Sequence, residues 1–212
     1  SNEKNSECNQ IGSAMKLLIE KDIKPSDIVT KKSLENALRL ITVLGGSTNA
    51  VLHFLAISKA ANLDISIDYF QEISDSTPFI ANLKPSGKYL MKDLHKIGGV
   101  PSVLKYMLEN KMLHGDCMTV TGKTMKENLK NIKFNPKQKV MRSYKDPLSP
   151  TGGVVGLKGN LAPEGAIVKV AGLKKLQFTG KARCFDNEES AMKAVQSKKY
   201  NDGDVIIIRY EG

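Results

Sequence analysis

The chain has 212 residues, of which 41% are hydrophobic, 25% are charged and none is tryptophan, and these proportions match ordinary globular proteins. A chain of this length can bury a sufficient core without disulfide bonds, as one large domain or two small ones. No apolar run approaches the ~20 residues that cross a bilayer, and the polar residues 1–10 do not resemble a secretory signal, so we expect a cytoplasmic protein with no membrane partner.

The chain carries 32 basic and 22 acidic residues, a net charge of +10. Such an excess occurs in nucleic-acid-binding proteins and also on solvated lysine-rich surfaces. Only four basic residues are arginine, whose bidentate fork recognises phosphates and bases better than lysine does. We therefore expect no nucleic-acid partner, and a basic binding module that uses Lys123 to Lys145 is the alternative.

Apolar residues at helical spacing predict a helix-rich first part of the chain. Thr30 is a suitable cap for the second helix, and Pro101 is placed to open the sixth. Apolar residues surround most of the third helix, from Ser47 to Ala61, which predicts that it is largely buried. The predicted helices cover residues 11–20, 31–44, 47–61, 67–74, 88–97, 101–110 and 124–129.

The composition changes after residue 130. Residues 131–150 are polar and basic with three prolines, which is typical of a linker. Short apolar runs then alternate with turns, and one helix, with Asp186 as its cap and Ala191, Met192 and Val195 facing inward, lies between the last two runs. These runs predict strands at residues 153–157, 166–170, 181–185 and 205–210. A small sheet of this kind is more often the first part of a larger domain.

The sequence GGSTN at residues 45–49 is the strongest candidate site. Two glycines let a backbone approach a ligand, and Ser47, Thr48 and Asn49 supply polar groups at a helix start. Unpaired amides and the helix dipole there favour an anion, such as the carboxylate of a small acid. Plain capping between two buried helices explains the same residues, so both interpretations stay open.

Other motifs are weaker. Gly122-Lys123-Thr124 is no phosphate loop, because Cys117 stands where that pattern needs glycine. The histidines and cysteines show no metal-ligand spacing, so we assign no metal site. His53 follows the apolar pattern of its helix and is expected in the core or a pocket wall. The glycine-rich residues 149–153 and 159–165 are read as tight turns.

Several segments, in the same order along the chain, carry a family resemblance. Among them are LGGSTNAVLH at residues 44–53 and GNLAPEGA at residues 159–166. The others are residues 27–30, 35–37, 83–89, 95–101, 115–124 and 205–212. Together they resemble the dihydroxy-acid dehydratases. Related sugar-acid dehydratases share residues 45–49, whereas residues 159–172 look more like the branched-chain biosynthetic enzyme than the phosphogluconate enzyme.

The resemblance implies a hydro-lyase that removes water from 2,3-dihydroxy-3-methylbutanoate and 2,3-dihydroxy-3-methylpentanoate, giving the 2-oxo acids of valine, leucine and isoleucine biosynthesis. Family members use an iron–sulfur cluster, a Mg²⁺ ion and a serine base. The family motifs that hold these groups lie outside this sequence, so we assign no catalytic residue and no metal ligand to it. The chain alone is expected to be an inactive fragment of a longer protein that is a homodimer.

The resemblance also implies an α/β fold. Residues 1–133 are expected to be the rear part of a helix-rich amino-terminal domain, residues 134–150 a linker, and residues 151–212 the first part of a carboxy-terminal swivelling β/β/α barrel. Gly46, Ser47, Thr48 and Asn49 are expected to bind the small-molecule dihydroxy acid. The alternative functions are a sugar-acid dehydratase of the same family and the basic nucleic-acid-binding module.

Overall fold

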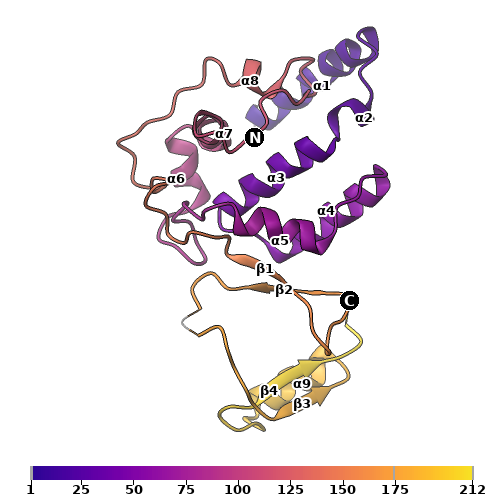
Figure 1. The fold of residues 1–212 in the computed structure, drawn as a ribbon, viewed down its shortest axis with the longest axis vertical. Coiled ribbons are helices and arrows are strands. Elements are labelled where there is room, and N and C mark those ends of the chain that lie inside the picture. Colours follow the sequence, from indigo (N-terminus) through magenta and orange to yellow (C-terminus); the bar gives the residue numbers. More distant parts are fainter. Residues whose placement is uncertain (1, 174, 212) are drawn as a thin grey trace. The chain divides into compact units, whose positions relative to one another are not determined.

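The computed structural model describes residues 2–173 and 175–211 (Figure 1). The chain divides into two compact units, with the boundary between Gly172 and Leu173. The first unit contains α1 (Asn2–Glu20), α2 (Pro25–Ile28), α3 (Lys31–Val43), α4 (Thr48–Ala60), α5 (Ile67–Asp75), α6 (Met91–Lys96), α7 (Gly99–Glu109), α8 (Met125–Asn128), β1 (Val154–Leu157) and β2 (Ala166–Lys169). The second contains β3 (Ala182–Phe185), α9 (Glu188–Gln196) and β4 (Val205–Ile208).

Local capping explains where several helices begin. The Thr30 hydroxyl accepts a hydrogen bond from Ser33 N at 3.2 Å, which confirms the predicted cap of α3. Ser66 caps α5 in the same way, accepting from Tyr69 N at 3.2 Å. Helix α1 begins earlier than predicted, because the residues before Ile11 are polar and show no apolar periodicity; residues 4–10 are exposed.

Helix α3 contributes to two apolar clusters of the first unit. It supplies Leu34 and Leu38 to one cluster, and its last residue, Val43, belongs to the other. The first cluster is completed by Val51, Ile65, Phe70, Ile73 and Val154. The second is completed by Ile80, Ala81, Leu83, Leu94, Val103, Met107, Leu113, Val140 and Met141. Helix α3 therefore links the two apolar clusters of the first unit.

Helix α4 is much less buried than the sequence predicts. Among its residues only Val51 and Ser58 are buried, and Leu52 is 62% exposed. One stripe of the helix packs on the unit, while its other apolar residues find no cover within the described part of the chain. His53 is exposed on this helix, so the prediction that it lies in the core is wrong, and the alternative of a pocket wall stays a prediction.

The β1–β2 hairpin packs on α5 and α4 within the first unit. Its strands are antiparallel, with Val154 opposite Lys169 and Leu157 opposite Ala166. The polar segment that precedes it is held against earlier residues, because Asn82 N donates to Val140 O at 2.9 Å and Val140 is buried. A linker composition therefore coexists here with firm packing.

In the second unit, β3 and β4 form a parallel pair that is connected through α9. The helix begins one residue later than predicted: Asn187 accepts from Ser190 N at 2.8 Å, while Asp186 pairs with Arg209. Ala191 is buried as expected, whereas Met192 and Val195, expected to face inward, are 49% and 41% exposed.

Helices and two small sheets together make an α/β fold, as the sequence predicts. The finer division into residues 1–133, 134–150 and 151–212 stays a prediction, because compact packing is a different criterion from membership of a family domain. Among the residues that the structure describes, no helix combines the length and apolarity that a membrane span requires.

Candidate functional site

The two glycines before α4 end α3 and bring its turn close to the hairpin. Gly45 and Gly46 have φ of +108° and +73°, and their N–H groups donate to Thr42 O and Ile41 O at 3.1 and 2.8 Å. This is the double hydrogen-bonded helix end that glycine favours. A Cβ on Gly46 would lie 2.5 Å from Val154 Cγ2. The glycines therefore serve backbone geometry and close packing.

The start of α4 lacks the side-chain cap that α3 and α5 have. Ser47 occupies the capping position with extended backbone, but its hydroxyl accepts no capping hydrogen bond, and Ser47 is exposed. The first amides of a helix have no partner inside the helix. At α4 the Ala50 amide donates to Ser47 O at 3.2 Å, while the amides of Thr48 and Asn49 and the positive end of the dipole are left for a ligand or solvent.

A pocket of about 660 Å³ opens at this helix start. It lies between the first turns of α4 and α5 and the connection of the β1–β2 hairpin. Thr48 and Asn49 line it, whereas Gly46 and Ser47 are in the adjoining turn and are not among its lining residues. The full lining is Thr48, Asn49, Leu52, Leu55, Ser66, Ile67, Asp68, Lys158, Glu164, Gly165, Ala166 and Ile167.

Glycines in the hairpin shape the far wall of the pocket. Ile67 packs closely on Gly156 in β1 and on Gly165 just before β2. A Cβ added to Gly156 would lie 3.0 Å from the Ile67 side chain, and a Cβ added to Gly165 would lie 2.8 Å from it. Gln71 and Ser74 fix the hairpin on α5, since Gly156 N donates to Gln71 Oε1 at 2.7 Å and Ser74 Oγ donates to Val154 O at 2.9 Å. These contacts therefore hold the hairpin wall of the pocket at a defined position on α5.

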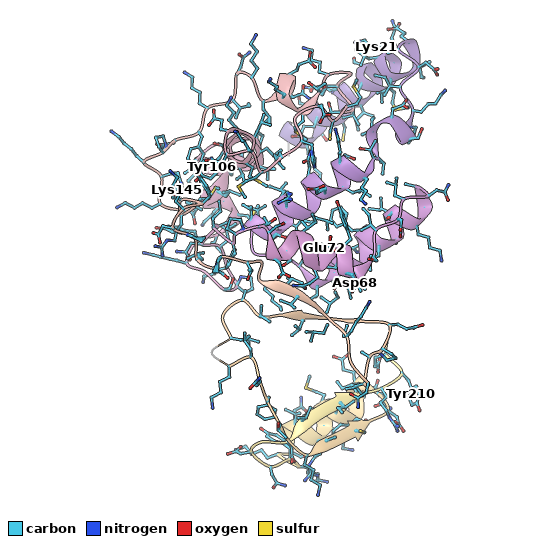
Figure 2. All side chains as sticks on the ribbon, viewed as in Figure 1. Lys21, Asp68, Glu72, Tyr106, Lys145 and Tyr210 are labelled. Carbon is cyan, nitrogen blue, oxygen red and sulfur yellow. The ribbon has the colours of Figure 1, made fainter. Side chains whose placement is uncertain are left out.

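The pocket has one side of mixed charge. Lys158 Nζ lies 2.6 Å from Asp68 Oδ2, and Asp68 is at the start of α5, on the side of the hairpin (Figure 2). Both side chains are about half exposed or more, and such exposed ion pairs contribute only about 0–1 kcal/mol to stability. This pair can therefore open for a ligand at little cost. Sequence reasoning missed it, because 90 residues separate its members.

A second polar cluster surrounds Glu35 on α3. Its carboxylate accepts from Arg39 Nε and from the Tyr69 hydroxyl, each at 3.0 Å, and lies 3.0 Å from His114 Nε2. Burial acts to raise the pKa of Glu35, but the hydrogen bonds from His114, Arg39 and Tyr69 overcome it and hold that pKa below its usual value. Burial and the bond to Glu35 raise the pKa of Tyr69. The cluster joins α3, α5 and the loop after α7.

The side chain of Asn36 holds the same loop by hydrogen bonds to the backbone of His114. It donates to His114 O at 2.9 Å and accepts from His114 N at 2.8 Å. Cys117 is buried beside it, and burial raises the pKa of its thiol. A thiol of this kind is a poor nucleophile and metal ligand. We therefore read Asn36 and Cys117 as structural.

The basic segment from Lys123 to Lys145 contains two aromatic residues, Phe134 and Tyr144. Both pack on Tyr106, with ring centroids 4.5 and 6.4 Å away, so their faces are partly occupied. Lys145 extends from the surface (Figure 2). The expectation that no nucleic acid binds here stays a prediction.

Comparison with known proteins places these features in a family. The model of the amino-terminal domain of dihydroxy-acid/6-phosphogluconate dehydratases matches residues 1–128, and that of the carboxy-terminal domain matches residues 139–212. The chain belongs to this dehydratase family, as its sequence resemblance implies.

Curated relatives carry the name dihydroxy-acid dehydratase. That of Pelagibacter ubique is 64% identical over 95% of the chain and 35% of the relative. Those of Francisella tularensis subsp. novicida and Flavobacterium psychrophilum are 53% and 51% identical over 99% and 100% of the chain and 38% of each relative. The chain thus spans little more than a third of the length of these relatives.

Proposed function

We propose that the longer protein to which this chain corresponds is a dihydroxy-acid dehydratase. It converts 2,3-dihydroxy-3-methylbutanoate and 2,3-dihydroxy-3-methylpentanoate to 2-oxo acids in branched-chain amino-acid biosynthesis, as a cytoplasmic homodimer. The observation that carries this proposal is 64% identity, over 95% of the chain, to a protein of that name. Residues 151–212 are then the start of the carboxy-terminal swivelling barrel.

The chemistry requires removal of the C2 proton and departure of the C3 hydroxyl, and an iron–sulfur cluster with Mg²⁺ supplies the Lewis acid in this family. The residues of this chain do not fit either group. Nowhere in the described ranges are three or more His, Cys, Asp or Glu residues grouped so that they could hold a metal ion. Cys8 and Cys184 are exposed, and Cys117 is buried beside Asn36. We therefore propose that this chain contributes substrate binding, while other parts of the protein hold the cluster and the Mg²⁺.

Binding is assigned to the start of α4. Thr48 and Asn49 line the pocket and offer a hydroxyl and an amide to the substrate's hydroxyl groups. Gly46 sets the turn, and Ser47, whose side chain makes no capping hydrogen bond, leaves the amides of Thr48 and Asn49 for the carboxylate. Leu52 and Leu55 form an apolar wall beside them, which suits a methyl-branched carbon chain.

Replacing Thr48 with valine in the full-length protein tests this assignment. The change keeps the shape of the side chain and removes one hydrogen bond, so kcat/KM should fall by about tenfold. Steady-state kinetics with 2,3-dihydroxy-3-methylbutanoate measure it. The matched control is Thr151→Val, at an exposed threonine outside the pocket lining, and it should leave kcat/KM unchanged. Equal kinetics for wild type and Thr48→Val would remove Thr48 from the site.

A sugar-acid dehydratase is the second candidate, because the matching family model covers phosphogluconate enzymes as well. The apolar residues of the pocket favour the branched acid. We expect the full-length protein to turn over 2,3-dihydroxy-3-methylbutanoate with a kcat/KM at least about a hundredfold above that for gluconate or 6-phosphogluconate. A preference for either sugar acid would reverse the assignment.

A further inference from the structure

The charged residues of the pocket leave it with an excess of negative charge. Asp68, Lys158 and Glu164 are its charged lining residues, which gives two carboxylates and one ammonium. The ammonium of Lys158 is already matched by Asp68 at 2.6 Å. Glu164 makes no ion pair with any residue in the described ranges. A ligand that enters therefore meets one negative charge that no lining residue balances.

The remaining wall of the pocket suits an uncharged carbon chain. Leu52 and Leu55 come from α4, Ile67 from α5 and Ile167 from β2. These side chains offer no hydrogen-bond partner to a sugar hydroxyl or a phosphate. The polar groups that can receive an acid are the side chains of Thr48 and Asn49 and the ammonium of Lys158.

We propose that this pocket selects acids that carry a single negative charge and repels acids that carry a phosphate as well, with Asp68 and Glu164 as the residues that determine this selectivity. The inference rests on the proposed function, since it takes the pocket as the substrate site. One carboxylate can share the ammonium of Lys158 when the exposed pair with Asp68 opens. A phosphate dianion adds two further charges, which both Asp68 and Glu164 repel.

Repulsion of this kind is a means of specificity that favourable contacts alone do not provide. Methyl-branched dihydroxy acids and 6-phosphogluconate share the carboxylate and the adjacent hydroxyl groups, so contacts at Thr48 and Asn49 cannot separate them. The phosphate is the group that differs most in charge. Carboxylates on the pocket lining repel an acid with a phosphate more strongly than an acid with one carboxylate, so they discriminate against the phosphorylated acid.

The test uses the full-length protein with the double substitution Asp68→Asn and Glu164→Gln, which removes both charges and keeps the side-chain shapes. We measure KM for 2,3-dihydroxy-3-methylbutanoate and the inhibition constant Ki of 6-phosphogluconate. The ratio Ki/KM should fall by about tenfold in the double variant, and the change should shrink in high salt. A ratio that stays within twofold of wild type, or that rises, would overturn the inference.

The control pair Glu72→Gln and Asp202→Asn makes the same change in net charge at exposed residues outside the pocket, and it should leave the ratio unchanged. An equal fall in the control would show that net charge alone is responsible, and it would overturn the inference too. Thr48→Val distinguishes failure of the charge selection from failure of the pocket as the substrate site. If Thr48→Val weakens turnover and the ratio does not move, only the charge selection fails; if Thr48→Val changes nothing, the pocket itself is not the substrate site.

Discussion

Replacing Gly46 with alanine should lower the free energy of unfolding by about 2–4 kcal/mol. Two independent costs add at this position. The backbone has φ of +73°, a left-handed conformation that a side chain disfavours, and the new Cβ would lie 2.5 Å from Val154 Cγ2. Val154 is buried in β1 and cannot move away freely. The substitution therefore strains both the turn that ends α3 and the packing of Val154 in β1 against that turn.

Urea unfolding followed by far-UV circular dichroism measures this effect, since the chain has no tryptophan for fluorescence. The matched control is Gly12→Ala. Gly12 lies inside α1, where an added Cβ meets nothing within 4 Å, so alanine should stabilise the helix slightly. Combining Gly46→Ala with Val154→Ala should cost less than the sum of the two single changes, because the clash is then relieved. A loss below about 1 kcal/mol for Gly46→Ala would contradict the strained turn.

Much of the helical order could be predicted because local signals agree with the packing. Thr30 and the apolar face of α3 give both the start and the buried side of that helix. Helix α4 shows the limit of this reasoning. Its apolar residues predict burial on most sides, yet burial depends on neighbours, and within the described part of the chain only one stripe has them. A sequence pattern reports which residues can be buried, whereas the fold decides which of them are.

The candidate site was predictable in part for the same reason. The sequence at residues 45–49 points to the start of α4, and Thr48 and Asn49 do line a pocket. Lys158 and Glu164 come from the β1–β2 hairpin, about a hundred residues after the start of α4 in the sequence. No local sequence pattern indicates that this hairpin packs on α5. The available signal is the pair of glycines that allow Ile67 to approach, and it becomes readable only once the strands are placed.

Glu35 has one partner nearby in the sequence and two that are distant in it. Glu35 and Arg39 lie four residues apart on α3 and form an ion pair at 3.0 Å. The further partners, Tyr69 and His114, lie 34 and 79 residues away along the chain and meet Glu35 only in the folded unit. With its side chain only 15% exposed, this carboxylate is worth more than a surface pair.

Replacing Glu35 with glutamine should lower the free energy of unfolding at pH 7 by about 2–3 kcal/mol. Glutamine keeps the size of the side chain but loses the charge that Arg39 faces, and its amide group cannot accept all the hydrogen bonds that the two carboxylate oxygens accept. The matched control is Glu72→Gln on α5, at an exposed glutamate, and it should change stability by less than about 0.5 kcal/mol (Figure 2).

The effect of Glu35→Gln should also depend on pH, with a sign that the pKa of Glu35 fixes. That pKa lies below the ordinary value of 4.5 in the folded chain, so folding favours the ionised carboxylate. The stabilisation is therefore complete above about pH 5.5 and is lost as the pH falls through 4.5 towards the lower folded value. Other carboxylates, such as Asp116, also titrate in this range, but they remain in both proteins and cancel in the difference. Urea unfolding of wild type and variant from pH 7 to pH 3 should show curves that converge at low pH. A constant difference across this range would mean that the charge of Glu35 contributes nothing to the stability of the fold.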